Sequence, residues 1–136
     1  MLQIFQWIVS QMLGDATLTA IVPAANILTG PVDILVWSQN TLMQPMIILS
    51  QVSETQRTVP QGARDTVIQI DIWSRNSQLE LENIYEEIIN LLSFQIANQG
   101  QAHIFWDRLS GAVDDFELDR RIWHRSVSQT FWSIKP

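Results

Sequence analysis

Residues 65–92 read DTVIQIDIWSRNSQLELENIYEEIINLL, and this stretch decides the predicted fold. Its first half alternates between apolar and polar side chains. Ile68, Ile70 and Ile72 would share one face of a strand, and the polar residues between them would share the other. Strict alternation over this length is typical of a sheet with one buried and one polar face.

The second half of the same stretch predicts an amphipathic helix. Ser77 is followed three residues later by Glu80, which is the spacing of a reciprocal capping box at a helix start. Apolar residues then recur every three or four positions, as they do along one face of a helix. This stripe consists of Leu81, Ile84, Tyr85, Ile88 and Leu92.

Further helices and strands are predicted on both sides of this unit. A stripe of apolar residues predicts an N-terminal helix that Gly14 ends, and Asp15 can cap a short second helix over Ala16–Ile21. Two short strands are expected at Ile27–Leu28 and Ile34–Val36. Longer strands are expected over Met46–Val52, which Pro45 precedes, over Ala102–Trp106, and over Ile122–Ile134.

Three segments between these elements are predicted as loops. Ser53–Arg64 is a polar run that contains Pro60 and Gly62, so we expect a projecting, mobile arm between two strands. Asn98-Gln99-Gly100 reads as a shorter loop. Asp107–Arg121 is acidic and turn-like, with a short strand as an option at Ala112-Val113.

The order of the predicted elements indicates the fold class. Only one helix lies between strands of the main sheet, so a doubly wound parallel sheet is not favoured. We predict one α+β domain over residues 1–136, in which a mostly antiparallel sheet of about four strands carries helices on one face. The length is sufficient for one domain with a core of its own.

The composition restricts the classes of partner. Only 16% of the residues are charged, the net charge is −6, and no basic residue precedes Arg57. Such a chain lacks the lysine and arginine footprint of proteins that grip phosphates or an anionic membrane. The absence of cysteine excludes disulfides and thiolate sites. No apolar run approaches the roughly 20 residues that span a bilayer, and we expect a soluble protein without a signal peptide.

The sequence offers no catalytic, cofactor or metal site. His103 and His124 are the only histidines, and no metal-ligand spacing surrounds them, so each is expected to be a partly exposed structural residue. An acidic run lacks the spacing of a calcium loop and is expected to be a solvated turn. This run contains Asp114, Asp115, Glu117 and Asp119, followed by Arg120 and Arg121.

The six tryptophans and the arm are the candidates for protein contacts. Tryptophan is enriched at the centres of interfaces, and core packing is expected to account for about half of them. The predicted interface residues of the arm are Thr55, Gln56, Arg57, Val59, Gln61 and Arg64.

Four segments of the chain resemble one family, in the family's order. Asp15–Ile21 is similar to its Asp-x-x-Leu-Thr-x-Leu/Ile segment, and Pro45–Leu49 to its proline-led first strand. Val67–Ser74 resembles its Val-Gln-Val-Asp-x-Trp strand, and Arg125–Trp132 resembles its closing strand. The family is that of the tail completion, or tail terminator, proteins of long-tailed bacteriophages. The stretch Ile34–Gln44 is longer than the family's pattern.

The resemblance implies a structural protein of the virion. Members form a ring, usually hexameric, at the head-proximal end of the tail tube, where they end polymerisation and join the tail to the head-neck connector. The implied partners are therefore copies of the chain, the major tail tube protein and the connector, in the host cytoplasm during assembly and then in the virion. Genome DNA would pass through the ring without specific binding, and the polar sheet face with Gln69 and Asp71 is the candidate lumen lining.

Two other readings stay open. A head-closure or stopper protein, or another neck protein, is the nearest alternative. A small-ligand-binding or enzyme domain is more remote, because no set of polar residues in the sequence has the spacing of a catalytic or ligand-binding site. A nucleic-acid-binding module is equally remote because basic residues are scarce.

Overall fold

The computed structural model describes residues 2–30, 44–56, 63–92, 96–99, 102–118 and 121–134. Helices begin the chain and strands end it. The elements are α1 (Leu2–Leu13), α2 (Ala16–Ile21), a 3-10 turn η1 (Ala24–Asn26), β1 (Ile27–Thr29), β2 (Met46–Gln56), β3 (Ala63–Ser74), α4 (Gln78–Leu92), β4 (Ile96–Gln99), β5 (Ala102–Glu117) and β6 (Ile122–Ile134).

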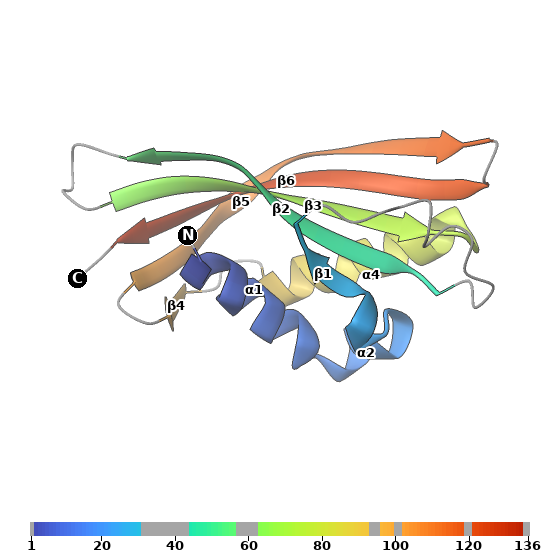
Figure 1. Cartoon of the computed structure of the whole chain (residues 1–136), viewed down its shortest axis with the longest axis horizontal. Helices are drawn as coiled ribbons and strands as arrows, with labels where there is room; N and C mark the ends of the chain where they lie inside the picture. The colour runs from blue at the N-terminus through green and yellow to red at the C-terminus, as the bar shows by residue number, and fades with distance from the viewer. Residues whose placement is uncertain are drawn as a thin grey trace.

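One mixed sheet organises the molecule, and the helices lie on one side of it (Figure 1). Its strand order is β1-β2-β3-β6-β5-β4. Only the pair β1 and β2 is parallel, and every other neighbouring pair is antiparallel. The predicted α+β class with a mostly antiparallel sheet is therefore confirmed. The sheet has six strands where about four were expected, because β1 and β4 add a short strand at each edge.

The strand–helix unit of residues 65–92 forms as its pattern predicts, with one difference at the cap. Ser77 Oγ accepts a hydrogen bond from the Glu80 backbone N–H at 3.1 Å. The Glu80 carboxylate does not return to Ser77. It accepts hydrogen bonds from Ser74 Oγ at 2.7 Å and from Asn76 Nδ2 at 2.9 Å. The helix start is thus tied to the end of the preceding strand, which fixes the angle between β3 and α4.

The main core lies between the helices and the sheet. The predicted stripe of α4 is buried there, except that Tyr85 is only partly buried. Ile68, Ile70 and Ile72 face the same core from β3, as their alternation indicates. The rings of Trp7 in α1 and Phe131 in β6 meet edge to face at 6.1 Å, a favourable geometry for aromatic pairs.

The opposite face of the sheet is less uniformly polar than the sequence predicts. Met46, Ile48 and Ile122 are buried on it, and Leu28 and Trp73 pack against them. These residues come from adjacent strands, because Met46 lies beside Trp73 and Leu28 beside Ile48 in the register. A small second core therefore covers one part of the face that was expected to be polar throughout.

Two of the predicted loops are strand over most of the residues that the structure describes in them. In the expected arm Ser53–Arg64, β2 continues to Gln56 and β3 begins at Ala63, in register from Ser53 opposite Val67 to Gln56 opposite Arg64. Backbone pairing with a neighbouring strand needs no apolar alternation, so the polar sequence did not reveal this extension. Residues 57–62 lie outside the described residues.

The acidic segment from Asp107 onward is also strand rather than turn. β5 continues to Glu117, paired with β6, and of this segment only Leu118 and Arg121 are described as turn residues. The predicted loop at 98–100 is likewise corrected, because Asn98 and Gln99 belong to β4. The expected strand at Ile34–Val36 lies outside the described residues. No helix in the described part of the chain is long and apolar enough to cross a membrane.

Candidate interaction surfaces

The predicted lumen residues Gln69 and Asp71 lie on the sheet face that points away from the helices, and both are only partly exposed. His124 Nε2 lies 2.7 Å from Asp71 Oδ1, and because an ionised carboxylate only accepts, the imidazole donates. Gln69 Nε2 donates to both oxygens of Asp71, at 3.1 and 2.9 Å. The His124 ring stacks on Trp73 at 3.8 Å between ring centres.

These contacts make Asp71 a structural residue of this face. Its side chain is 14% exposed and that of His124 is 21% exposed. The expectation of a partly exposed structural histidine is therefore confirmed for His124, whereas the side chain of His103 lies outside the described residues. Asp71 is a poorer lumen probe than the sequence suggested, because a substitution would also break its contact with His124.

The same contacts contribute to how the stability of the folded protein changes at acidic pH. Burial raises the pKa of Asp71, but hydrogen bonds from His124, Gln69 and Ser126 and the charge of His124 outweigh burial and hold this pKa below its ordinary value of 3.8. The hydrogen bonds of Arg125 likewise lower the pKa of Asp114, against burial. A lowered pKa means that the folded state binds the proton more weakly than the unfolded chain.

We expect the stability from these two carboxylates to be fully present above pH 3.8 and to be lost as the pH falls below that value. Urea unfolding of the wild type between pH 6 and pH 2.5 measures the loss. Asp71→Asn should be less stable at pH 6 and should lose less on acidification. An equal loss in the variant and the wild type would contradict the role of Asp71.

Arg125 joins three elements on the helix-facing side of the sheet. Its Nε and Nη2 atoms donate to the two oxygens of Asp114 in β5, at 2.6 and 2.8 Å. Its Nη1 atom donates to Glu82 in α4 at 2.7 Å, and the guanidinium lies 4.8 Å from the ring centre of Tyr85. The pKa of Arg125 is raised, first by its hydrogen bonds to Asp114. This network attaches α4 to β5 and β6.

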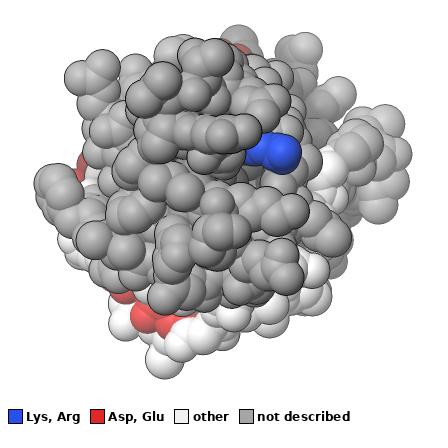
Figure 2. Space-filling model, turned by 90° about the vertical axis from the view of Figure 1, so that its left-hand side faces the viewer, with Lys and Arg blue, Asp and Glu red and all other residues white. Residues whose placement is uncertain are grey.

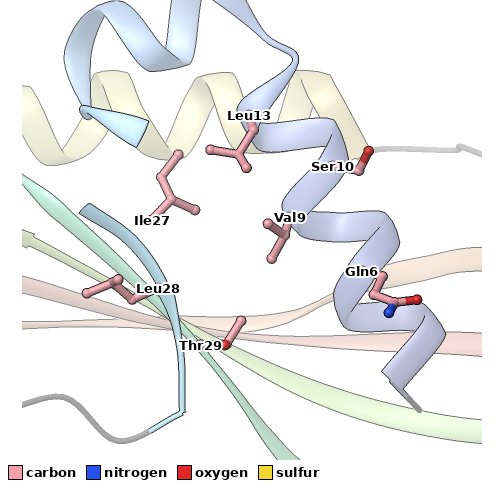
Figure 3. Close-up of a pocket in the computed structure, with 7 residues that line it drawn as sticks. All are labelled: Gln6, Val9, Ser10, Leu13, Ile27, Leu28 and Thr29. Atoms are coloured by element: carbon pink, nitrogen blue, oxygen red, sulfur yellow. The ribbon is translucent and has the colours of Figure 1, made fainter. Parts of the chain in front are cut away.

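An open groove of about 620 Å³ lies between α1 and the edge strand β1, and we call it the α1–β1 groove. It is lined by Gln6, Val9, Ser10, Leu13, Ile27, Leu28 and Thr29. Figure 3 shows Val9 and Leu13 of α1 across the gap from Ile27 of β1. No lining residue is charged, and Leu13 is 44% exposed. One sequence feature could have indicated this groove, since α1 carries no charged residue on any face.

The predicted arm residues divide between the strands and the undescribed segment. Thr55 and Gln56 are in β2 and Arg64 is in β3, whereas Arg57, Val59 and Gln61 lie outside the described residues. No observation tests their predicted role in an interface, so it stays a prediction.

The tryptophans that can be described serve the fold. Trp7 is buried in the main core, Trp73 stacks on His124, and Trp123 packs against Phe116 at 4.3 Å between ring centres. The side chains of Trp37, Trp106 and Trp132 lie outside the described residues.

Charged side chains among the described residues are few at one end of the molecule. Figure 2 shows one small basic patch and a few small acidic patches among the described residues at the left-hand end of the molecule in Figure 1. Within the described part of the chain, no group of three or more His, Asp or Glu side chains could hold a metal ion.

Comparison with known proteins gives a shared fold and no family. No model of a protein family matches the sequence, and no curated protein matches it either. Among solved structures, the chain is similar to a chain in the virion of a native gene transfer agent particle, with a TM-score of 0.67 and 10% sequence identity. The match covers 95% of this chain and 92% of the other. At this identity the likeness establishes the fold.

Proposed function

We propose that this protein is a structural component of a phage-like virion and, within it, the tail terminator. In this role it forms a ring at the head-proximal end of the tail tube, ends tail polymerisation and joins the tail to the head-neck connector. The observation that carries the proposal is the fold shared with a virion chain over nearly the full length of both chains. The order of the four family-like segments in the sequence supports the finer assignment.

The surface properties support a subunit that contacts other proteins. A ring requires two different patches on each subunit that meet head to tail. The α1–β1 groove is apolar and open, and only 16% of the residues in the chain are charged. A net charge of −6 also suits a ring through which DNA slides, because such a ring should not bind phosphates tightly. Within this proposal, a neighbouring protein contacts the predicted interface residues Thr55, Gln56, Arg57, Val59, Gln61 and Arg64.

Loss of the protein should leave two separate products in infected cells. We expect capsids filled with DNA beside unattached tails, some of them longer than normal, because nothing would stop the addition of tube subunits. Electron microscopy of lysates from a virus with the gene inactivated measures tail length and attachment. A copy of the gene supplied in trans should restore joined particles of normal tail length.

The same micrographs separate the proposal from its nearest alternative. A head-closure protein seals the portal, so its loss should leave capsids that have lost their DNA, beside tails of normal length. That result would overturn the tail-terminator assignment while leaving a virion role in place. Joined, infectious particles in the absence of the protein would overturn both.

A further inference from the structure

The main core contains a buried glutamine on the face of the sheet that the helices cover. Gln129 of β6 is 0% exposed. Its neighbours on the same face of β6 are Val127 and Phe131, which both belong to the main core, and the Phe131 ring meets Trp7 of α1. Among the described residues, neither the amide nitrogen nor the amide oxygen of Gln129 has a hydrogen-bond partner.

Thr66 of β3 places a second polar group beside Gln129. In the register of the two strands, Gln129 lies opposite Ile68 and Thr66 lies opposite Phe131, so Thr66 and Gln129 are diagonal neighbours on one face. Side chains at diagonal positions of an antiparallel pair are close enough for a long side chain to reach across. Thr66 is also 0% exposed, and its hydroxyl has no hydrogen-bond partner among the described residues.

The strands on both sides of this pair are irregular at the same level of the sheet. β5 carries two register shifts against β6, and Gln129 pairs with Leu109 in the short stretch between them. β2 carries another shift against β3, between Gln51 and Ser53, next to the position of Ile68. A bulge leaves an extra residue unpaired and bends its strand. We therefore expect the side chains at this level to pack less regularly than those of an uninterrupted ladder.

We propose that Gln129 and Thr66 bind internal water, one molecule of which bridges the two side chains. Buried polar groups in native proteins are paired with the protein or with ordered water, because an unpaired one costs free energy. A bridging water accepts a hydrogen bond from the Thr66 hydroxyl and donates one to the Gln129 amide oxygen. A neutral ligand is favoured because the core cluster on this face consists of apolar side chains, which offer an ion no counter-charge.

A high-resolution crystal structure of the full-length chain tests the site directly. We expect a peak of electron density, refined as water, within hydrogen-bond distance of both the Thr66 hydroxyl and the Gln129 amide. Buried waters of this kind typically make about three hydrogen bonds. A map without density between the two side chains would overturn the proposal.

A double-mutant cycle tests the same site in solution. Gln129→Met keeps the length of the side chain and removes the amide, and Thr66→Val keeps the shape and removes the hydroxyl. Each single variant leaves the other polar group without its bridge, so the urea midpoint of unfolding should fall in both. The double variant should lose less than the sum of the two, because replacing both partners by apolar groups leaves no polar group unpaired.

The matched control is the cycle of Gln129→Met with Thr130→Val. Thr130 is the next residue of β6 and lies on the opposite face of the sheet, so the effects of these two substitutions should add. A higher urea midpoint in Gln129→Met than in the wild type would overturn the proposal, because it would mean that the amide is unpaired in solution. Additive effects of Gln129→Met and Thr66→Val would also overturn it. The water site is independent of the proposed ring, so none of these results bears on the tail-terminator assignment.

Discussion

Replacing Arg125 by alanine should lower the free energy of unfolding by about 2 to 3 kcal/mol. Removing one partner of a fully buried ion pair usually costs about 3 to 5 kcal/mol, and we expect a smaller loss here because the partners of Arg125 are partly exposed. The guanidinium side chain is 9% exposed, whereas those of Glu82 and Asp114 are 44% and 33% exposed. The alanine variant would leave two carboxylates close together and would remove the link from α4 to the sheet.

Two further variants show which property of Arg125 matters. Arg125→Lys keeps the charge but cannot donate to both oxygens of Asp114 in a planar fork, so we expect it to recover less than half of the loss. Asp114→Asn should make the wild-type protein less stable but should change the Arg125→Ala variant little, because the partner is already gone. Urea unfolding at pH 7 measures the three single variants and the double variant Arg125→Ala/Asp114→Asn. Additive effects of the two substitutions would contradict the direct pairing.

Adding a positive charge to the polar sheet face should slow the passage of DNA several-fold if this face lines the lumen. Ser128 is a better site than Asp71, because it takes no part in the contact between Asp71 and His124, and its neighbour in β5 is Gly111, which has no side chain. It lies directly beside Gln69 in the register, on the same face. A ring of Ser128→Lys subunits would attract the phosphates, each close contact displacing about one counterion.

The control for this experiment is Ser128→Glu, which adds a side chain of similar length and the opposite charge. Particles that carry it should release DNA at the wild-type rate or faster. The rate of DNA release from purified particles, triggered in vitro and followed with an intercalating dye, distinguishes the variants. Equal rates for the lysine and glutamate variants would show that this face points away from the DNA.

The local sequence pattern was sufficient to predict an element where its apolar residues follow the period of the strand or helix without interruption. The isoleucines of β3, the helix stripe of α4 and the cap at Asp15 all form as predicted. The first part of β5, Ala102–Trp106, was predicted, but its continuation to Glu117 was not, because its alternation is interrupted twice. Its register shifts between Trp106 and Arg108 and again between Leu109 and Gly111. Each bulge moves the following side chains to the other face, so a period of two cannot be read along the strand.

The candidate interaction surfaces could be recognised only from the three-dimensional structure. Arg125 pairs with Asp114, 11 residues away, and with Glu82, 43 residues away, and neither separation produces a local pattern. The α1–β1 groove combines a helix with an edge strand that begins 14 residues after that helix ends. What the sequence did indicate is the low charge content of the chain, in which only 16% of the residues are charged.

Imaging of purified tails is the most direct test of a terminating ring. Tail tubes assembled without this protein should have bare ends, and addition of the purified chain should place one ring at one end of each tube. Such capped tubes should not lengthen when more tube subunits are supplied, whereas bare tubes should continue to grow. Tubes that bind no ring, or that grow equally with and without the protein, would contradict the account.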